Sequence, residues 1–141
     1  MSTELPDVNV LVAATNPDHL HHKIANAWLT SCTSYATTPI TESGLVRCLM
    51  NPRITARPAD YRAAVQLLNS IKSSNRATFW PDVVPLSPVN IVFTGKIGYR
   101  QVTDMHLVNL AAHYSGKLIT LDRRILGAMH PKDHYLIHVL S

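Results

Sequence analysis

The chain lacks the features that mark membrane, secreted or disordered proteins. None of its apolar runs reaches the roughly 18 to 20 residues that a membrane-spanning helix needs. Its first residues, Met1–Glu4, lack the basic start and long apolar segment of a signal peptide. It contains no internal repeat, low-complexity tract or charge block. With 46% apolar and 16% charged residues over 141 positions, the composition is typical of one globular domain, which we expect to be cytoplasmic.

Cysteine is scarce as well. The two cysteines, Cys32 and Cys48, provide neither a disulfide framework nor the spacing of a zinc site. Both stand beside apolar neighbours. We therefore expect reduced, buried thiols that carry no chemistry.

Acidic residues are few in this basic chain. Nine Asp and Glu residues face thirteen Lys and Arg residues, which gives a net charge of +4 and a sequence pI near 9.3. This balance favours polyanionic partners without identifying one. Several of the acids lie beside apolar runs rather than in solvated charge clusters: the nine are Glu4, Asp7, Asp18, Glu42, Asp60, Asp82, Asp104, Asp122 and Asp133.

Apolar periodicity predicts helices that alternate with strands. Helices are expected over residues 18–29, 39–50, 58–72, 104–114 and 123–126, and strands over 33–38, 77–80, 117–121 and 135–140. The Pro- and Gly-rich segment 81–98 is expected to be mostly loop, with one helical turn near Val89. Such alternation predicts an α/β sandwich with a largely parallel sheet, in which ligands gather at the carboxyl ends of the strands.

The segment Leu5–Ala14, LPDVNVLVAA, places Asp7 and Asn9 in an otherwise apolar run. The alternating valines fit a strand that begins at Asp7. Alternatively, residues 3–6 form a short strand, Asp7 ends it and a helix begins at Asn9. The pattern alone leaves both interpretations open.

Glu42 stands in an unusual place on its predicted helix. If Thr38 caps this helix, the reciprocal position of a capping box is Thr41, so Glu42 misses it by one residue. Apolar residues three, four and seven positions further on share its face. A carboxylate on such a face requires a cation or strong hydrogen-bond donors.

Asp104 and Asp122 each fit two roles. Asp104 lies in the first turn of a predicted helix, where an acid interacts well with free N–H groups, yet Leu107 and Ala111 share its face. Asp122 stands between a strand and a helix, which is both a capping position and the carboxyl edge of the sheet. Capping and a functional role remain open for both.

Four acids from four segments, Asp7, Glu42, Asp104 and Asp122, can converge at one sheet edge only if their repulsion is offset. A divalent cation with oxygen ligands is a common solution. Two such ions roughly 3.5 to 4 Å apart can activate water and stabilise the leaving oxygen of a phosphodiester. In a basic protein, this arrangement suggests cleavage of a nucleic acid.

Short motifs in this order resemble those of PIN domains, and in particular of the VapC-like toxins of bacterial toxin–antitoxin pairs. The matching stretches are Asp7-Val8-Asn9-Val10-Leu11, Thr38-Pro39-Ile40-Thr41-Glu42, Thr103-Asp104-Met105-His106-Leu107 and Thr120-Leu121-Asp122-Arg123. Asn51-Pro52-Arg53-Ile54 resembles a stretch found in one VapC subset. Together they span nearly the whole chain.

The resemblance implies one PIN domain over residues 1–141, folded as an α/β/α sandwich with a central, mainly parallel sheet. It implies a metal-dependent endoribonuclease with Mg²⁺ or Mn²⁺ at the acidic centre. In this family the first Asp ends the first strand, which favours the second interpretation of LPDVNVLVAA. By the same resemblance, the catalytic and metal-binding residues are Asp7, Glu42, Asp104 and Asp122, with Asn9 and Thr120 as supporting or water-positioning groups.

The resemblance also implies partners. VapC-like proteins usually dimerise and are silenced by a small cognate antitoxin, so we expect an RNA substrate, a VapB-like antitoxin, a homodimer and no membrane. RNA choice is expected to depend on basic rims around Arg53, Arg57, Lys96 and Arg100. An alternative is a non-catalytic module with a PIN fold that sequesters RNA or an antitoxin.

The cluster His19-Leu20-His21-His22 invites a zinc site, because imidazoles bind such ions well. No partner except Asp18 is placed to complete a tetrahedral set. We interpret these histidines as solvated residues at a helix start, some of them in reach of RNA. The stretch Asp7-Val8-Asn9 resembles the Asp-x-Asp motif of phosphatases, but Asn9 stands where that motif has its second Asp.

Overall fold

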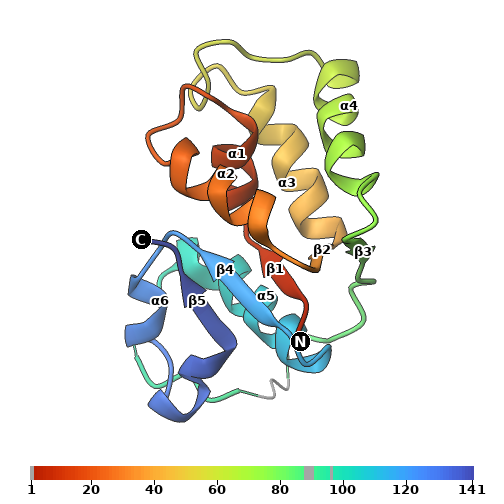
Figure 1. Ribbon diagram of the computed structural model, residues 1–141. Coiled ribbons are helices and arrows are strands. Elements are labelled where there is room, and N and C mark those ends of the chain that lie inside the picture. Colours follow the sequence, from red (N-terminus) through yellow and green to blue (C-terminus); the bar gives the residue numbers. More distant parts are fainter. Residues whose placement is uncertain (1, 88–90, 96) are drawn as a thin grey trace.

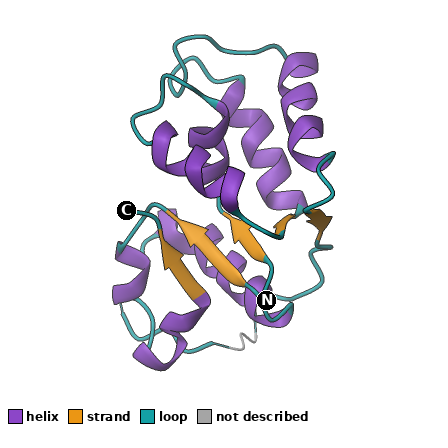
Figure 2. Cartoon of the chain, viewed as in Figure 1, coloured by secondary structure: helices purple, strands orange, loops and turns teal. Residues whose placement is uncertain are grey.

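The computed structural model describes residues 2–87, 91–95 and 97–141 (Figure 1). The helical turn expected near Val89 and the predicted rim residue Lys96 lie outside these residues. Five parallel strands form one sheet in the order β3-β2-β1-β4-β5. Helices cover both faces of this sheet (Figure 2). The predicted α/β/α sandwich with a parallel sheet is therefore confirmed.

All strands are short. They are β1 Glu4–Pro6, β2 Tyr35–Thr37, β3 Ala77–Phe79, β4 Lys117–Thr120 and β5 Ile137–Val139. The helices are α1 Val8–Thr15, α2 His22–Ser31, α3 Pro39–Leu49, α4 Tyr61–Lys72, α5 Val102–His113 and α6 Arg124–Gly127. Two 3₁₀ segments, η1 Tyr99–Gln101 and η2 Pro131–Leu136, precede α5 and β5.

The central strand β1 is where the direction of the sheet's growth reverses. From β1 the chain adds β2 and then β3 on one side, and it later returns to add β4 and β5 on the other side. Pro6 pairs with Ile119, so β1 and β4 end almost level. In open parallel sheets, a crevice forms at such a reversal, outside the carboxyl ends of the strands. The residues that directly follow β1 and β4 therefore face a common space.

Two hydrophobic clusters hold the layers together. Helices α1 to α4 pack on one face of the sheet, against Tyr35 and Ile119, while α5, α6 and η2 pack on the other face, against Ala36 and Leu118. Neighbouring residues of one strand thus belong to opposite clusters, as the pleat requires. The parallel sheet is therefore covered on both of its faces.

The structure resolves the two interpretations of LPDVNVLVAA in favour of the second. β1 ends at Pro6 and α1 begins at Val8, with Asp7 as the N-cap of the helix. Asp7 Oδ1 accepts a hydrogen bond from the backbone N–H of Val10 at 2.8 Å. Val10 is completely buried against the sheet, so capping and burial outweigh the strand propensity of the valines.

The predicted start of the second helix, residue 18, is wrong. α2 begins at His22, and residues 17–21 form a turn. Asn16 closes this turn: its Oδ1 accepts from Asp18 N at 3.2 Å and its carbonyl accepts from His19 N at 3.0 Å. Such local bonds compete with helix formation. Leu20, expected on the packing face of the helix, is 89% exposed.

Other boundaries shift for similar reasons. α4 begins at Tyr61 rather than residue 58, because Asp60 Oδ1 caps it by accepting from Ala63 N at 2.8 Å. The last strand is shorter than predicted, since η2 occupies residues up to Leu136.

The expectation of buried, reduced thiols holds for Cys32 and only in part for Cys48. Cys32 and Cys48 are free, the first buried and the second half-buried. Burial raises the pKa of both thiols, that of Cys32 to about 12. In the part of the chain that is described, no helix is both long and apolar enough to span a membrane.

Gly116, between α5 and β4, allows two segments to approach closely. A Cβ atom there would overlap the Thr3 carbonyl oxygen and the Trp80 ring. We predict that Gly116→Ala lowers the free energy of unfolding by about 1–3 kcal/mol, measured by urea titration. Gly127→Ala is the matched control, because nothing lies within 4 Å of its added Cβ. Equal stability of the two variants would contradict the prediction.

Candidate active site

Asp7 is anchored at the junction of β1 and β4. Its side chain is 2% exposed, and each carboxylate oxygen has a donor. Oδ1 accepts from Val10 N, and Oδ2 accepts from Thr120 Oγ1 at 2.6 Å. Thr120 is the last residue of β4. These bonds fix the carboxylate at the point where the strand order reverses.

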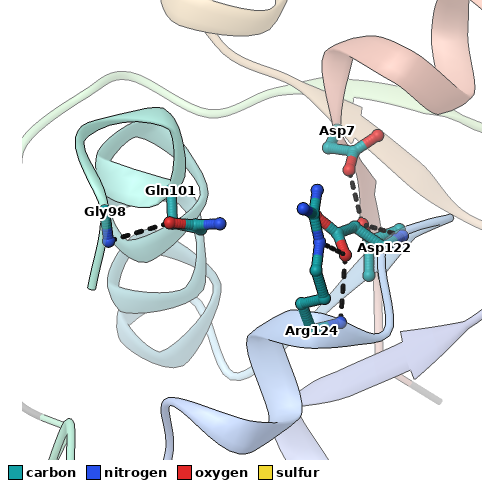
Figure 3. Close-up of polar contacts among 6 residues, drawn as sticks. Asp7, Gly98, Gln101, Asp122 and Arg124 are labelled. Carbon is teal, nitrogen blue, oxygen red and sulfur yellow. Dashed lines mark hydrogen bonds and ion pairs between the residues drawn. The ribbon is translucent and has the colours of Figure 1, made fainter. Parts of the chain in front are cut away.

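Asp122 follows Thr120 at the same edge. Its backbone N–H donates to Thr120 Oγ1 at 3.0 Å, so one hydroxyl contacts both Asp7 and the loop that carries Asp122. The Arg124 guanidinium donates from Nε and Nη2 to the two Asp122 oxygens, each at 2.9 Å (Figure 3). This bidentate pair lowers the pKa of Asp122. Asp122 is therefore a carboxylate anion at neutral pH.

Asp104 is the third aspartate of the cluster, and it comes from α5, on the opposite face of the sheet from α1. It lies in the first turn of α5, which directly follows η1 in the chain. Gln101 Oε1, at the end of η1, accepts a hydrogen bond from Gly98 N at 2.9 Å (Figure 3). Burial, followed by the negative charges of Asp7 and Asp122, raises the pKa of Asp104 to about 7.

Asp7 shows the same effect. Burial is the main cause that raises its pKa to about 6, and the charge of Asp122 adds to it. Three aspartates from different segments are thus close enough to repel one another. Asp7 and Asp104 are carboxylates whose negative charge is poorly compensated within the protein.

Glu42 has partners of its own. It accepts from Thr37 Oγ1 at 2.7 Å and pairs with Lys72 Nζ at 2.8 Å. Lys72 also lies 5.0 Å from the centre of the Phe79 ring. The expectation that Glu42 needs a cation and strong donors is therefore confirmed. It faces a groove between α3 and α4, and its role as a metal ligand stays a prediction.

The three aspartates fit a hydrated divalent cation better than a closed metal cage. Among the described residues, no three His, Cys, Asp or Glu side chains are arranged to hold a metal ion. Mg²⁺, however, usually keeps several waters and takes only one or two carboxylates from the protein. The donor atoms here are oxygens, and the raised pKa values of Asp7 and Asp104 show where positive charge would be stabilising.

A cavity of about 420 Å³ opens beside Asp122. Its lining residues come from α1, from the turn before α2 and from the segment after β4: Asn9, His19, His21, Leu121, Asp122 and Arg124. Asn9 is exposed there, near the N-terminus of α1. Arg124 has no role among those predicted from the sequence. A basic residue two positions after an acid in a strand–helix turn is a signal that could have indicated it.

The predicted basic rim is dispersed. Arg100 lies exposed on η1, which leads into the helix of Asp104, and its guanidinium contacts the ring of Tyr99. Arg57 lines a different cavity, together with Asp18, and Arg53 is exposed in the loop between α3 and α4. Of these cations, Arg100 lies closest in sequence to Asp104, and Arg124 is the one paired with Asp122.

An acidic cluster at the reversal point of a parallel α/β/α sheet is the arrangement expected of a PIN-like nuclease. No family model matches the chain. It is 42% identical to ribonuclease VapC39 of Mycobacterium tuberculosis over 129 residues, which covers 85% of this chain and 88% of that protein. The chain belongs to the VapC ribonuclease family.

Solved structures agree with this fold. The crystal structure of VapC20 of Mycobacterium tuberculosis, described as a sarcin-ricin loop cleaving toxin, superposes with a TM-score of 0.61 at 14% identity, covering 89% of this chain and 95% of that one. The crystal structure of VapBC2 of Rickettsia felis, bound to a DNA fragment from its promoter, superposes with a TM-score of 0.60 at 12% identity, and the match covers 99% of each chain.

The electrostatics of the cluster predict a pH-dependent stability. The folded protein retains protons on Asp7 and Asp104 that the unfolded chain releases near pH 4. Without divalent cations, the free energy of unfolding should therefore fall as the pH rises from about 4 to about 7. Asp104→Asn should flatten this decline and raise stability at about pH 8 by on the order of 1 kcal/mol.

Urea titrations in EDTA at acidic and alkaline pH test this. Asp60→Asn is the control, because Asp60 is an exposed N-cap and Asn caps as well as Asp. A larger gain from Asp60→Asn than from Asp104→Asn at alkaline pH would refute the electrostatic account.

Proposed function

We propose that this protein is a Mg²⁺- or Mn²⁺-dependent endoribonuclease that acts as the toxin of a type II toxin–antitoxin pair. The observation that carries the proposal is the convergence of Asp7, Asp104 and Asp122 at the reversal point of the sheet. It occurs in a chain that is 42% identical to a ribonuclease.

Each aspartate has a distinct environment, which supports a distinct role. Asp7 is held rigidly by Val10 and Thr120, so it can bind a cation without reorganisation. Asp104 offers a second carboxylate from the opposite layer. When bound, the cation would supply positive charge at the phosphodiester oxygens and lower the pKa of a water molecule.

The surroundings of the cluster are suited to an RNA backbone. The Arg124 side chain is 79% exposed although it is paired with Asp122, so its outer N–H groups can contact a phosphate. Arg100 extends the positive charge on the side of α5. Asn9 and Thr120 would support water and ligand positions around Asp7. RNA, rather than a small phosphoester, fits an open cavity in a chain of net charge +4.

The proposal includes the partners of a toxin. The similarity in fold to VapBC2 supports a VapB-like antitoxin as the inhibitor. We extend the proposal to a homodimer that acts on RNA in the cytoplasm. The groove between α3 and α4 contains exposed Met50 and Tyr61, which offer apolar surface to a protein partner.

Removing one carboxylate tests the enzyme assignment. Asp7→Asn keeps the helix cap, yet it removes the anchored charge, so Mn²⁺-dependent cleavage of total RNA should fall at least about a hundredfold. Asp104→Asn should act similarly, and EDTA should abolish cleavage by the parent protein. Growth inhibition on induction should disappear with both variants.

Asp60→Asn is the control for these measurements, since Asp60 caps α4 on the exposed surface. Circular dichroism verifies that each variant is folded. Undiminished cleavage by both Asp7→Asn and Asp104→Asn would contradict the enzyme assignment. Tight RNA binding by a parent protein that never cleaves would favour the non-catalytic module instead.

Glu42 is proposed as the fourth acid of the centre, and its ion pair allows a separate test. Glu42→Gln should raise the Mn²⁺ concentration for half-maximal cleavage by about tenfold, because it removes a negative charge near the site. Lys72→Met removes the partner cation of Glu42 and should lower this concentration. If both variants lose stability and neither changes the Mn²⁺ requirement, Glu42 serves only to join α3 to α4.

A further inference from the structure

The turn between α1 and α2 brings two histidines to the acidic centre. We call residues His19–His21 the histidine turn. His19 and His21 line the same cavity as Asn9, Asp122 and Arg124. The sequence alone placed these histidines at the start of a helix, as solvated residues of which some lie in reach of RNA. The structure instead makes them one wall of the cavity beside Asp122.

Hydrogen bonds fix the shape of this turn. His19 N donates to the Asn16 carbonyl and His22 N donates to the His19 carbonyl, both at 3.0 Å. The ring of His22 is 2.8 Å from the Ala13 carbonyl, which ties the turn to the end of α1. His21 N donates to His19 Nδ1 at 3.0 Å. A neutral His19 ring therefore carries its proton on Nε2, where it can donate to a ligand.

The exposed groups of the turn suit an aromatic ligand. The rings of His19 and His21 lie 5.8 Å apart, and the His21 side chain is exposed. Between them, Leu20 is 89% exposed although it is large and apolar. Burial, followed by the neighbouring histidines, lowers the pKa of His19, which favours the neutral ring. Planar rings beside apolar surface are what unstacked nucleobases bind.

Other residues that line this cavity supply groups for the sugar-phosphate backbone. Arg124 presents an exposed guanidinium, and Asn9 presents a side-chain amide at the N-terminal turn of α1. A zinc site is disfavoured, because the described residues offer no group of three suitable ligands there. A cavity lined by both aromatic rings and a cation matches single-stranded RNA.

We propose that the histidine turn is a nucleobase platform, on which His19 and His21 stack bases of single-stranded RNA next to the phosphodiester held at the aspartates. The inference rests on the proposed ribonuclease function and deepens it. The platform selects unpaired RNA, because a base within a duplex cannot reach the rings. It is already shaped before RNA arrives, so little conformational entropy is lost on binding.

Binding without cleavage tests the platform. In EDTA, fluorescence anisotropy measures the affinity for a labelled single-stranded RNA of roughly 12 nucleotides and for a duplex of the same sequence. The double variant His19→Ala/His21→Ala should bind the single strand about tenfold more weakly and the duplex as before. His19→Phe/His21→Phe keeps the ring faces and should remain within about twofold of the parent protein.

His130→Ala is the matched control. Like His19, His130 is an accessible histidine whose Nδ1 accepts from the backbone N–H two residues on, that of Lys132 at 3.1 Å. It does not line the cavity beside Asp122. Its replacement should leave the affinity for both RNAs unchanged.

The outcomes separate this inference from the proposed function. Cleavage by the parent protein together with unchanged single-strand affinity of His19→Ala/His21→Ala overturns the platform alone. Equal losses for single strand and duplex also overturn it, because they indicate backbone contacts only. If the variant instead weakens only the binding of a purified antitoxin, the turn is a protein contact and the inference is wrong. A parent protein that binds but does not cleave contradicts the proposed function.

Discussion

The hydrogen bond from Thr120 Oγ1 to Asp7 Oδ2 joins the two strands on which the site depends. It requires β1 and β4 to end level, and the pairing of Pro6 with Ile119 provides this alignment. The same hydroxyl accepts from Asp122 N, so one threonine orients two acids. Helices α1 and α5 then cover opposite faces of the sheet and deliver their first turns to the same edge. The acidic centre is therefore a consequence of strand order.

Burial of neighbouring carboxylates at this edge of the sheet lowers the stability of the folded protein. Asp7 and Asp104 have raised pKa values because they are buried near other carboxylates, while Asp122 is held as an anion by Arg124. Preorganised charge of this kind destabilises the isolated protein and strengthens the binding of a cation. Two acids away from this edge have ion-pair partners: Glu42 pairs with Lys72 and Asp82 with His106. The buried negative charge is concentrated at the edge of the sheet where Asp7 and Asp104 meet.

Much of the fold could be predicted, because apolar periodicity reports directly on burial. The helices over 39–49 and 102–113 and the strands β2 to β5 occur nearly where the sequence predicts them. The start of α2 differs from the prediction, because the Asn16 side chain accepts from Asp18 N and so forms a turn at the place where a helix was expected to begin. Residues 8–15 form a helix because Asp7 caps it. The sequence pattern does not indicate whether this cap outweighs the preference of the valines for a strand.

By itself, the sequence determined the class of fold, the chemistry of the oxygen donors and the family resemblance, because these follow from residue type, periodicity and order along the chain. Only the tertiary structure decided which acids meet. It brought Asp7, Asp104 and Asp122 together, joined Glu42 to Lys72, and turned His19 toward the same cavity as Asp122. These outcomes depend on strand order and on turns between distant segments, and contacts across such distances in sequence leave no periodic signal in the chain.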